Sequence, residues 1–443
     1  MKRAISILFA LLIIAVCVIP AAAVDYGCNV DTVSGAVYLE NLDTGAVVYE
    51  KNSTTQMYPA STTKIMTYVI TAENVTDFDN TMVEIKEDVI TGLDPESTVM
   101  GLSSHIGEQV SVRDLLYGLM LPSGNDAALV LADYVGSGIP HFVEMMNAKA
   151  AELGCTGTHF MNPHGLYDAD HYTTAHDMAL IAKHARTLNS FMEITSTVYY
   201  TPSGFETLHN TNYMLDSEFE GGAYYYPYTK GIKTGYLDEA GKCLVTTAEK
   251  DGFTYLCVCL GANYSYAEDV NYAMKDTANL YNWAYENLGT QTVYGPSDTV
   301  TTVPVKYVWG DKTVTAVPEK EVFALLPHNF NKDLIVVDIN CKDEVEAPVK
   351  KGDVLGTVSV RYDDMDLGTT NVVALEDIER DGLNYTLSKI GEFIKTHIVL
   401  VLIIVVVLIL MIILLVAASS ARRRRKARAA RARNRGAAGR HSR

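Results

Sequence analysis

The stretch YPASTTK, residues 58–64, places a serine three positions before a lysine. Apolar residues at helical spacing follow from Ile65 to Ile70, so the stretch predicts a helix that begins near Ser61. Residues i and i+3 are neighbours on a helix surface, which puts Ser61 and Lys64 side by side. Free N–H groups at a helix N-terminus also stabilise negative charge on an attacked carbonyl oxygen. The stretch therefore predicts a serine nucleophile with a lysine base, although an isolated S-x-x-K is more often a helix cap followed by a solvated lysine.

Two further motifs follow in the same order along the chain. Ser123-Gly124-Asn125 is a compact turn after the apolar run Leu119–Pro122, and a turn between hydrophobic segments can present its polar side chains inward. The stretch 231–236, GIKTGY, precedes strand-like sequence and predicts a strand with Lys233 and Gly235 on one face and Thr234 on the other. Gly235 would leave room for a substrate backbone. Lys233 would supply a cation for a carboxylate and would lower the pKa of Lys64.

The three motifs together resemble the penicillin-recognising serine enzymes, with their S-x-x-K, S-x-N and K-T-G elements. Within that group, the chain is most similar to the low-molecular-mass penicillin-binding proteins, the serine-type D-alanyl-D-alanine carboxypeptidases. The similarity extends from about Gly35 to Arg380. The stretches that carry it are 115–128, 162–166, 173–179 and 233–236.

The resemblance implies a role for each matched residue. Ser61 would be the acylated nucleophile, Lys64 the general base and Ser123 a proton relay to the leaving D-alanine. On the substrate-binding side it implies Asn125 at the peptide carbonyl, Lys233 and Thr234 at the terminal carboxylate, Gly235 beside them, and the backbone N–H groups of Ser61 and Tyr236 as the oxyanion hole. It implies neither a metal nor a cofactor.

The implied reaction is removal of the terminal D-alanine from peptidoglycan stem pentapeptides through a serine acyl-enzyme, with covalent binding of β-lactams. The middle motif is Ser-Gly-Asn, where class A β-lactamases have Ser-Asp-Asn, and no equivalent of their deacylating glutamate loop precedes Lys233. We therefore expect slow release of a penicilloyl ester. The open alternatives are a β-lactamase, a DD-endopeptidase or transpeptidase on the same scaffold, and a non-catalytic wall-binding protein.

The strand and helix patterns predict an α+β fold with several parts. A hairpin at 36–50 and the strands after Lys233 would form one antiparallel sheet around a helical subdomain, as in a penicillin-binding or β-lactamase-like transpeptidase domain. Short alternating strands then predict a small β-rich domain. The expected boundaries are 1–23 for a signal peptide, 24–295 for the catalytic domain, 296–386 for the β-rich domain, 387–397 for a juxtamembrane connector, 398–418 for a transmembrane helix and 419–443 for a basic tail.

The two ends of the chain predict export and membrane anchoring. Basic residues, an apolar run and an Ala-x-Ala site at 21–23 are typical of a cleaved signal peptide. Ile398–Ala418 is uncharged and would be about 32 Å long as a helix, enough to cross a bilayer. Eleven of the 36 basic residues follow it, so the positive-inside rule predicts a cytoplasmic tail and an extracytoplasmic catalytic domain. The acidic remainder disfavours binding to nucleic acid.

Cysteine and histidine spacing indicate neither a disulfide scaffold nor a metal centre. Cys257 and Cys259 alternate with apolar residues on a predicted strand, which favours buried thiols over a ligand pair. Five histidines lie between His159 and His184 without the spacing of a zinc site. We interpret Asn162–Leu166, which contains His164, as a structured loop.

Overall fold

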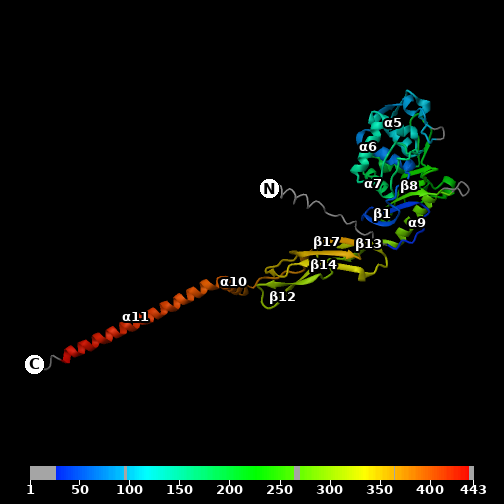
Figure 1. Ribbon diagram of the computed structural model, residues 1–443. Helices are drawn as coiled ribbons and strands as arrows, with labels where there is room; N and C mark the ends of the chain where they lie inside the picture. The colour runs from blue at the N-terminus through cyan, green and yellow to red at the C-terminus, as the bar shows by residue number, and fades with distance from the viewer. Residues whose placement is uncertain (1–25, 94–96, 264–269, 364, 439–443) are drawn as a thin grey trace. The chain divides into compact units, whose positions relative to one another are not determined.

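The computed structural model describes residues 26–93, 97–263, 270–363 and 365–438, with side chains to residue 430 (Figure 1). The expected signal peptide, 1–23, lies outside this range. The chain divides into two compact units. Of the described residues, the first unit contains those from 26 to 292 together with 323–335 and 361–366, and the second contains the others. Each unit is described separately below.

A five-stranded antiparallel sheet forms the centre of the first unit. Its order is β2-β1-β9-β8-β7, so an N-terminal hairpin pairs with strands that follow Lys233, as predicted. Val37 faces Cys259 across the β1–β9 pair, and Lys233 faces Val245 across the β7–β8 pair. The strands are β1 (Ala36–Asn41), β2 (Ala46–Lys51), β7 (Thr229–Leu237), β8 (Gly241–Lys250) and β9 (Phe253–Ala262).

Helices cover both faces of this sheet, and the alternation along each strand decides which residue meets which helix. Val258 and Leu260 pack into the core shared with the helical subdomain, whereas Cys257 and Cys259 pack against α9 (Tyr272–Asn287). The two thiols are buried and free of a disulfide, as predicted, and their sulfur atoms lie 3.8 Å apart. The subdomain comprises α2 (Lys64–Asn74), α3 (Glu87–Ile90), α4 (Val112–Met120), α5 (Asn125–Gly136), α6 (Ile139–Glu152), α7 (Ala175–Ala185) and α8 (Phe191–Ser196). The predicted α+β class is confirmed.

Further strands form a second sheet and a separate two-stranded pair. A six-stranded sheet has the order β14-β16-β17-β12-β11-β15. Its members are β11 (Thr301–Lys306), β12 (Lys312–Pro318), β14 (Ile335–Cys341), β15 (Val345–Glu346), β16 (Val354–Tyr362) and β17 (Met365–Ala374). The sequence analysis did not predict β13 (Val322–Pro327), which pairs with β10 (Leu288–Tyr294). Three of its consecutive side chains, from Ala324 to Leu326, are buried, so it lacks the alternation that marks a strand in sequence.

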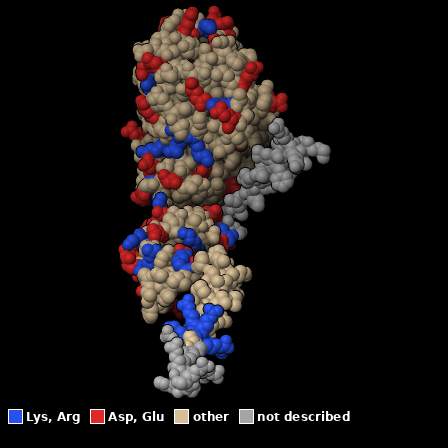
Figure 2. All heavy atoms as spheres, turned by 90° about the vertical axis from the view of Figure 1, so that its left-hand side faces the viewer, with Lys and Arg blue, Asp and Glu red and all other residues tan. Residues whose placement is uncertain are grey.

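Two helices end the described chain. Helix α10 (Gly382–Thr396) is followed after His397 by α11 (Ile398–Ala438). The part of α11 from Ile398 to Ala430 is long and apolar enough to cross a membrane. This is the predicted span, and the helix continues through it into the basic tail, where Arg and Lys side chains gather (Figure 2).

Candidate active site

A tight turn joins the predicted nucleophile to its base. Residues Ala60–Thr63 form a 3₁₀ turn, η1, and α2 begins only at Lys64. The sequence analysis expected a helix from about Ser61, so the structure differs in the type of the first turn. In a 3₁₀ turn, residues i and i+3 lie almost above one another. Accordingly, Lys64 Nζ donates a hydrogen bond of 3.0 Å to Ser61 Oγ.

Lys64 is buried completely. Besides Ser61 Oγ, its Nζ donates to Asn125 Oδ1 at 2.7 Å and to the backbone carbonyl of His164 at 2.7 Å. Burial holds the pKa of Lys64 well below its usual value, and the positive charge of Lys233 lowers it further, whereas Asp126 opposes the shift. A lysine with a lowered pKa can be neutral near physiological pH and can accept a proton.

The loop Asn162–Leu166 packs directly on the Ser61 turn. Asn162 Oδ1 accepts a 2.7 Å hydrogen bond from Gly165 N, and His164 Nδ1 accepts one of 3.2 Å from Leu166 N. Gly165 has φ +88°, and a Cβ there would overlap the carbonyl of Ala60. The predicted structured loop is therefore present. Its contact with Lys64 uses a backbone carbonyl, which carries no sequence signature.

Ser123 and Lys233 each present a buried polar atom that has no hydrogen-bond partner among the described residues. These atoms are Ser123 Oγ and Lys233 Nζ. Ser123 has φ +67°, at the turn that leads into α5, and Lys233 is 1% exposed on β7. Burial lowers the pKa of Lys233 to about 7. Unpaired buried polar groups are costly and rare in folded proteins. Ser123 lines the cavity described next, so its hydroxyl is suited to bind a ligand, whereas Lys233 is not among the lining residues.

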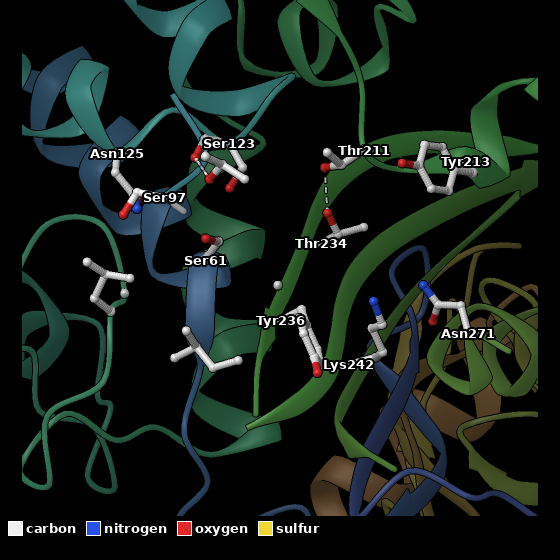
Figure 3. A pocket seen from close by; sticks show the side chains of 15 residues that line it. Ser61, Ser97, Ser123, Asn125, Thr211, Tyr213, Thr234, Tyr236, Lys242 and Asn271 are labelled. Atoms are coloured by element: carbon white, nitrogen blue, oxygen red, sulfur yellow. Dashed lines mark hydrogen bonds between the residues drawn. The ribbon is translucent and has the colours of Figure 1, made fainter. Parts of the chain in front are cut away.

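A cavity of about 320 Å³ opens beside Ser61. Figure 3 shows Ser61 between Ser123 and Asn125 on one side and Tyr236 on the other. Thr234 also lines it, and its Oγ1 lies 2.6 Å from Thr211 Oγ1. Seven lining residues were not predicted from the sequence: Ser97, Thr98, Thr211, Tyr213, Leu237, Lys242 and Asn271. They come from loops and strand ends, where no spacing rule marks them.

Gly235 makes a close backbone contact that the sequence did not suggest. We expected it to make room for a substrate backbone; it does line the cavity, and the nucleophile turn also lies against it. A Cβ at position 235 would lie 2.9 Å from Ser61 N and 3.0 Å from Ala60 Cβ. Gly235 thus allows β7 to approach the backbone of Ser61, which brings the two predicted oxyanion-hole segments together.

Replacing Gly235 by alanine should therefore move the nucleophile relative to β7. We expect kcat/KM to fall about 10²-fold, because a displacement near 1 Å costs that much in a positioned site. Acylation by a fluorescent penicillin measures the effect. Gly391→Ala is the control, since a Cβ there meets no atom within 4 Å. Unchanged acylation of the Gly235 variant would contradict the close packing.

Asp126 holds the second motif in place, although the sequence did not mark it. Its carboxylate accepts hydrogen bonds from the backbone N–H groups of Met100, Gly101 and Leu102, at 2.8, 2.9 and 2.9 Å. These bonds fix the start of α5, from which Asn125 reaches Lys64. Within the described ranges, no group of three or more His, Cys, Asp or Glu side chains could hold a metal ion.

Comparison with known proteins agrees with this geometry. Residues 26–264 match the family description D-alanyl-D-alanine carboxypeptidase, and residues 289–380 match the C-terminal domain of penicillin-binding protein 5. The chain is 31% identical to D-alanyl-D-alanine carboxypeptidase DacF of Bacillus subtilis over 81% of this chain and 90% of that protein.

Solved structures of penicillin-binding proteins and a DD-transpeptidase are also similar to this chain. Penicillin-binding protein 5 of Haemophilus influenzae is similar with a TM-score of 0.58 at 27% identity, over 79% of this chain and 98% of that one. A variant of a Streptomyces DD-transpeptidase is similar with a TM-score of 0.51 at 30% identity, over 58% of this chain and 99% of that one. This chain belongs to the D-alanyl-D-alanine carboxypeptidase family.

Proposed function

We propose that this protein is a serine-type D-alanyl-D-alanine carboxypeptidase that removes the terminal D-alanine from peptidoglycan stem pentapeptides. The observation that carries the proposal is the contact between Lys64 Nζ and Ser61 Oγ at 3.0 Å, beside a cavity that Ser123 and Thr234 also line. The family's carboxypeptidases and penicillin-binding proteins support it.

In the proposed mechanism, neutral Lys64 accepts the proton of Ser61 as Oγ attacks the carbonyl carbon between the two D-alanines. The N–H groups of Ser61 and Tyr236 stabilise the resulting oxyanion. Ser123 relays the proton that Lys64 accepted to the nitrogen of the leaving D-alanine, so that the C–N bond breaks, Lys64 is neutral again and an ester remains on Ser61. Water then hydrolyses the ester with Lys64 again as base.

A separate group of residues would bind the terminal carboxylate of the substrate. Lys233 supplies the charge, and the Thr234 hydroxyl, held by Thr211, supplies a hydrogen bond. Asn125 has two roles in this proposal: its Oδ1 orients Lys64, and its side chain, which lines the cavity, contacts the substrate's peptide carbonyl. A carboxylate bound at Lys233 would also complete the hydrogen bonding of that buried Nζ.

The products from a stem pentapeptide test the reaction. We expect free D-alanine and tetrapeptide in equal amounts, which chromatography and mass spectrometry of the reaction mixture would measure. Cross-linked dimer formed at the expense of free tetrapeptide would instead support a transpeptidase, and cleavage of a purified cross-linked dimer would support an endopeptidase. A protein that forms no product and takes no penicillin label would be a non-catalytic wall-binding protein.

β-Lactams would acylate the same serine, because they present a strained amide and a carboxylate in the same relative positions. The Ser-Gly-Asn motif and the Asn162–Leu166 loop, which lies against Ser61 and supplies no glutamate, favour a long-lived ester. A β-lactamase would require fast deacylation, for which the described part of the cavity offers no carboxylate among its lining residues.

We expect a bell-shaped dependence of kcat/KM on pH. Lys64 must be neutral, so the rate rises as pH rises through its lowered pKa. Lys233 must be charged to bind the carboxylate, so the rate falls as pH rises through its pKa of about 7. In Lys233→Arg the guanidinium stays charged, and the alkaline fall should move to higher pH. An identical alkaline limb in both proteins would contradict the assignment of Lys233.

We also propose that the protein is held in the membrane by α11 with its catalytic unit outside the cytoplasm. The apolar segment from Ile398 and the following arginines support this orientation through the positive-inside rule. The domain boundaries given from the sequence, including the signal peptide, stay predictions. Protease added to intact cells should digest the catalytic unit and leave an epitope at the C-terminus intact.

A further inference from the structure

A second cavity, of about 360 Å³, lies in the first unit and is lined by residues that the proposed mechanism does not use. Three chain segments line both cavities, at positions two or three residues apart. In the catalytic cavity these positions are Ser61, Leu166 and Leu237, and in the second cavity they are Tyr58, Ala169 and Glu239. Three residues span at most about 11 Å, so the second cavity is a neighbour of the first.

The order of residues along β7 indicates which end of the substrate faces the second cavity. In the proposed mechanism, Lys233 and Thr234 bind the terminal carboxylate, and the N–H group of Tyr236 contacts the carbonyl that is attacked. Leu237 follows as the last residue of β7, and Glu239 lies in the turn beyond it. A strand advances about 3.3 Å per residue. The second cavity therefore lies on the side of the scissile bond that carries the rest of the peptide.

Two tyrosines, Tyr58 and Tyr172, form an aromatic wall of this cavity. Met57 and Thr173 make an antiparallel bridge, in which Met57 N donates to the Thr173 carbonyl at 2.7 Å and Thr173 N donates to the Met57 carbonyl at 2.9 Å. Tyr58 and Tyr172 are the next opposed pair, so their side chains lie on the same side of the bridge. The ring of Tyr58 also meets Tyr167 edge-on, with centroids 5.1 Å apart. The negative face of an aromatic ring attracts cations.

Glu239 adds a negative charge beside the aromatic wall. It is the one charged residue among the described residues that line the cavity, and it is exposed. Within the described ranges, its carboxylate takes part in no hydrogen bond or ion pair. The turn that carries it is held in place, because Ala240 N donates to the Leu237 carbonyl at 3.1 Å. The thiol of Cys243 lies 3.7 Å from the Tyr58 carbonyl and 3.9 Å from the Ala240 carbonyl, which joins this turn to the Tyr58 segment.

We propose that the second cavity binds a side-chain ammonium group on the substrate residue that precedes D-Ala-D-Ala. This inference rests on the proposed function and adds one feature of its substrate. One step along the peptide spans about 4 Å, and a side chain of four methylene groups with a terminal ammonium adds about 6 Å. Their sum is close to the reach of the three residues from Ser61 to Tyr58. The ammonium would pair with Glu239 and lie against the rings of Tyr58 and Tyr172, so a diamino acid fits this position of the stem.

Two stem pentapeptides that differ by one charge test the cavity. The third residue is L-lysine in one peptide and Nε-acetyl-L-lysine, which is neutral, in the other. We expect the full-length protein to show a kcat/KM about fivefold to tenfold higher for the charged peptide, as for an ion pair at a partly exposed site with a cation–π contact. The release of D-alanine measures both rates. Added salt should reduce the ratio, because ions screen exposed charge pairs.

Variants of Glu239 assign the preference to this cavity. Glu239→Gln should bring the ratio to about one, and Glu239→Lys should favour a pentapeptide with L-glutamate as its third residue over the lysine peptide, a reversal that damage to the fold would not produce. Glu84→Gln is the matched control, since Glu84 is exposed at the end of β3 (Met82–Glu84) and lines neither cavity. It should keep the wild-type ratio.

The wild-type rates separate this inference from the proposed function. Equal kcat/KM values for the lysine and acetyl-lysine peptides, or an unchanged ratio in Glu239→Gln, would overturn the role of the second cavity alone. A wild-type protein that releases D-alanine from neither peptide would overturn the proposed function, and the role of the cavity with it.

Discussion

Ser61→Ala should abolish covalent labelling by a fluorescent penicillin and lower kcat/KM for a stem pentapeptide on the order of 10⁴-fold or more. In the proposed mechanism the Ser61 hydroxyl forms the ester. Lys64 Nζ is already directed at it over 3.0 Å, so its removal leaves the base without a proton to accept.

A folded control is needed to interpret that loss. The substitution removes one hydroxyl from a half-buried position, so the thermal unfolding midpoint should stay close to that of the wild type. Ser104→Ala changes an exposed serine of the same unit and should keep full labelling. Residual stoichiometric labelling of the Ser61 variant would exclude Ser61 as the acylated residue.

Lys64→Met should lower the rate of acylation about 10³-fold, within the range for loss of a general base. Methionine has a similar length and no charge, so it removes the proton acceptor while filling most of the same volume. Noncovalent binding of a D-Ala-D-Ala peptide should be reduced much less, because Lys233 and Thr234 contact the carboxylate in the proposed complex. Stopped-flow labelling separates the acylation rate from the preceding binding step.

The matched control is Lys86→Met, which removes an exposed lysine paired with Asp133 at 2.8 Å. Its acylation rate should equal that of the wild type. Asn125 Oδ1 and the His164 carbonyl each lose a donor in the Lys64 variant, so some loss of stability is expected. A Lys64 variant that folds and is acylated at the wild-type rate would show that another group is the base.

The parts of the site that the sequence predicted are those fixed by short-range geometry. Ser61 and Lys64 meet because they are three residues apart at the start of a helix, and Lys233 and Gly235 share one face because a strand alternates. That the three motifs lie together in the fold was predicted only from the family resemblance. No local rule places Lys233 close enough to Lys64 to shift its pKa.

Contacts made by the backbone could not be predicted. The His164 carbonyl that binds Lys64 and the Asp126 carboxylate that binds three N–H groups near Met100 depend on how distant loops pack. The packing of the Ser61 turn against Gly235 was not predicted for the same reason, because it depends on contacts between segments that are distant in the sequence. Strand β13 was missed because its buried residues are consecutive.

Mass spectrometry of the penicillin adduct tests the central claim most directly. The purified full-length protein is incubated with benzylpenicillin, digested at successive times and searched for the modified peptide. We predict one adduct per chain, located on Ser61, that persists through many times the interval needed to form it. An adduct on another residue, or an ester on Ser61 that turns over as fast as it forms, would contradict a D-alanyl-D-alanine carboxypeptidase that uses this serine.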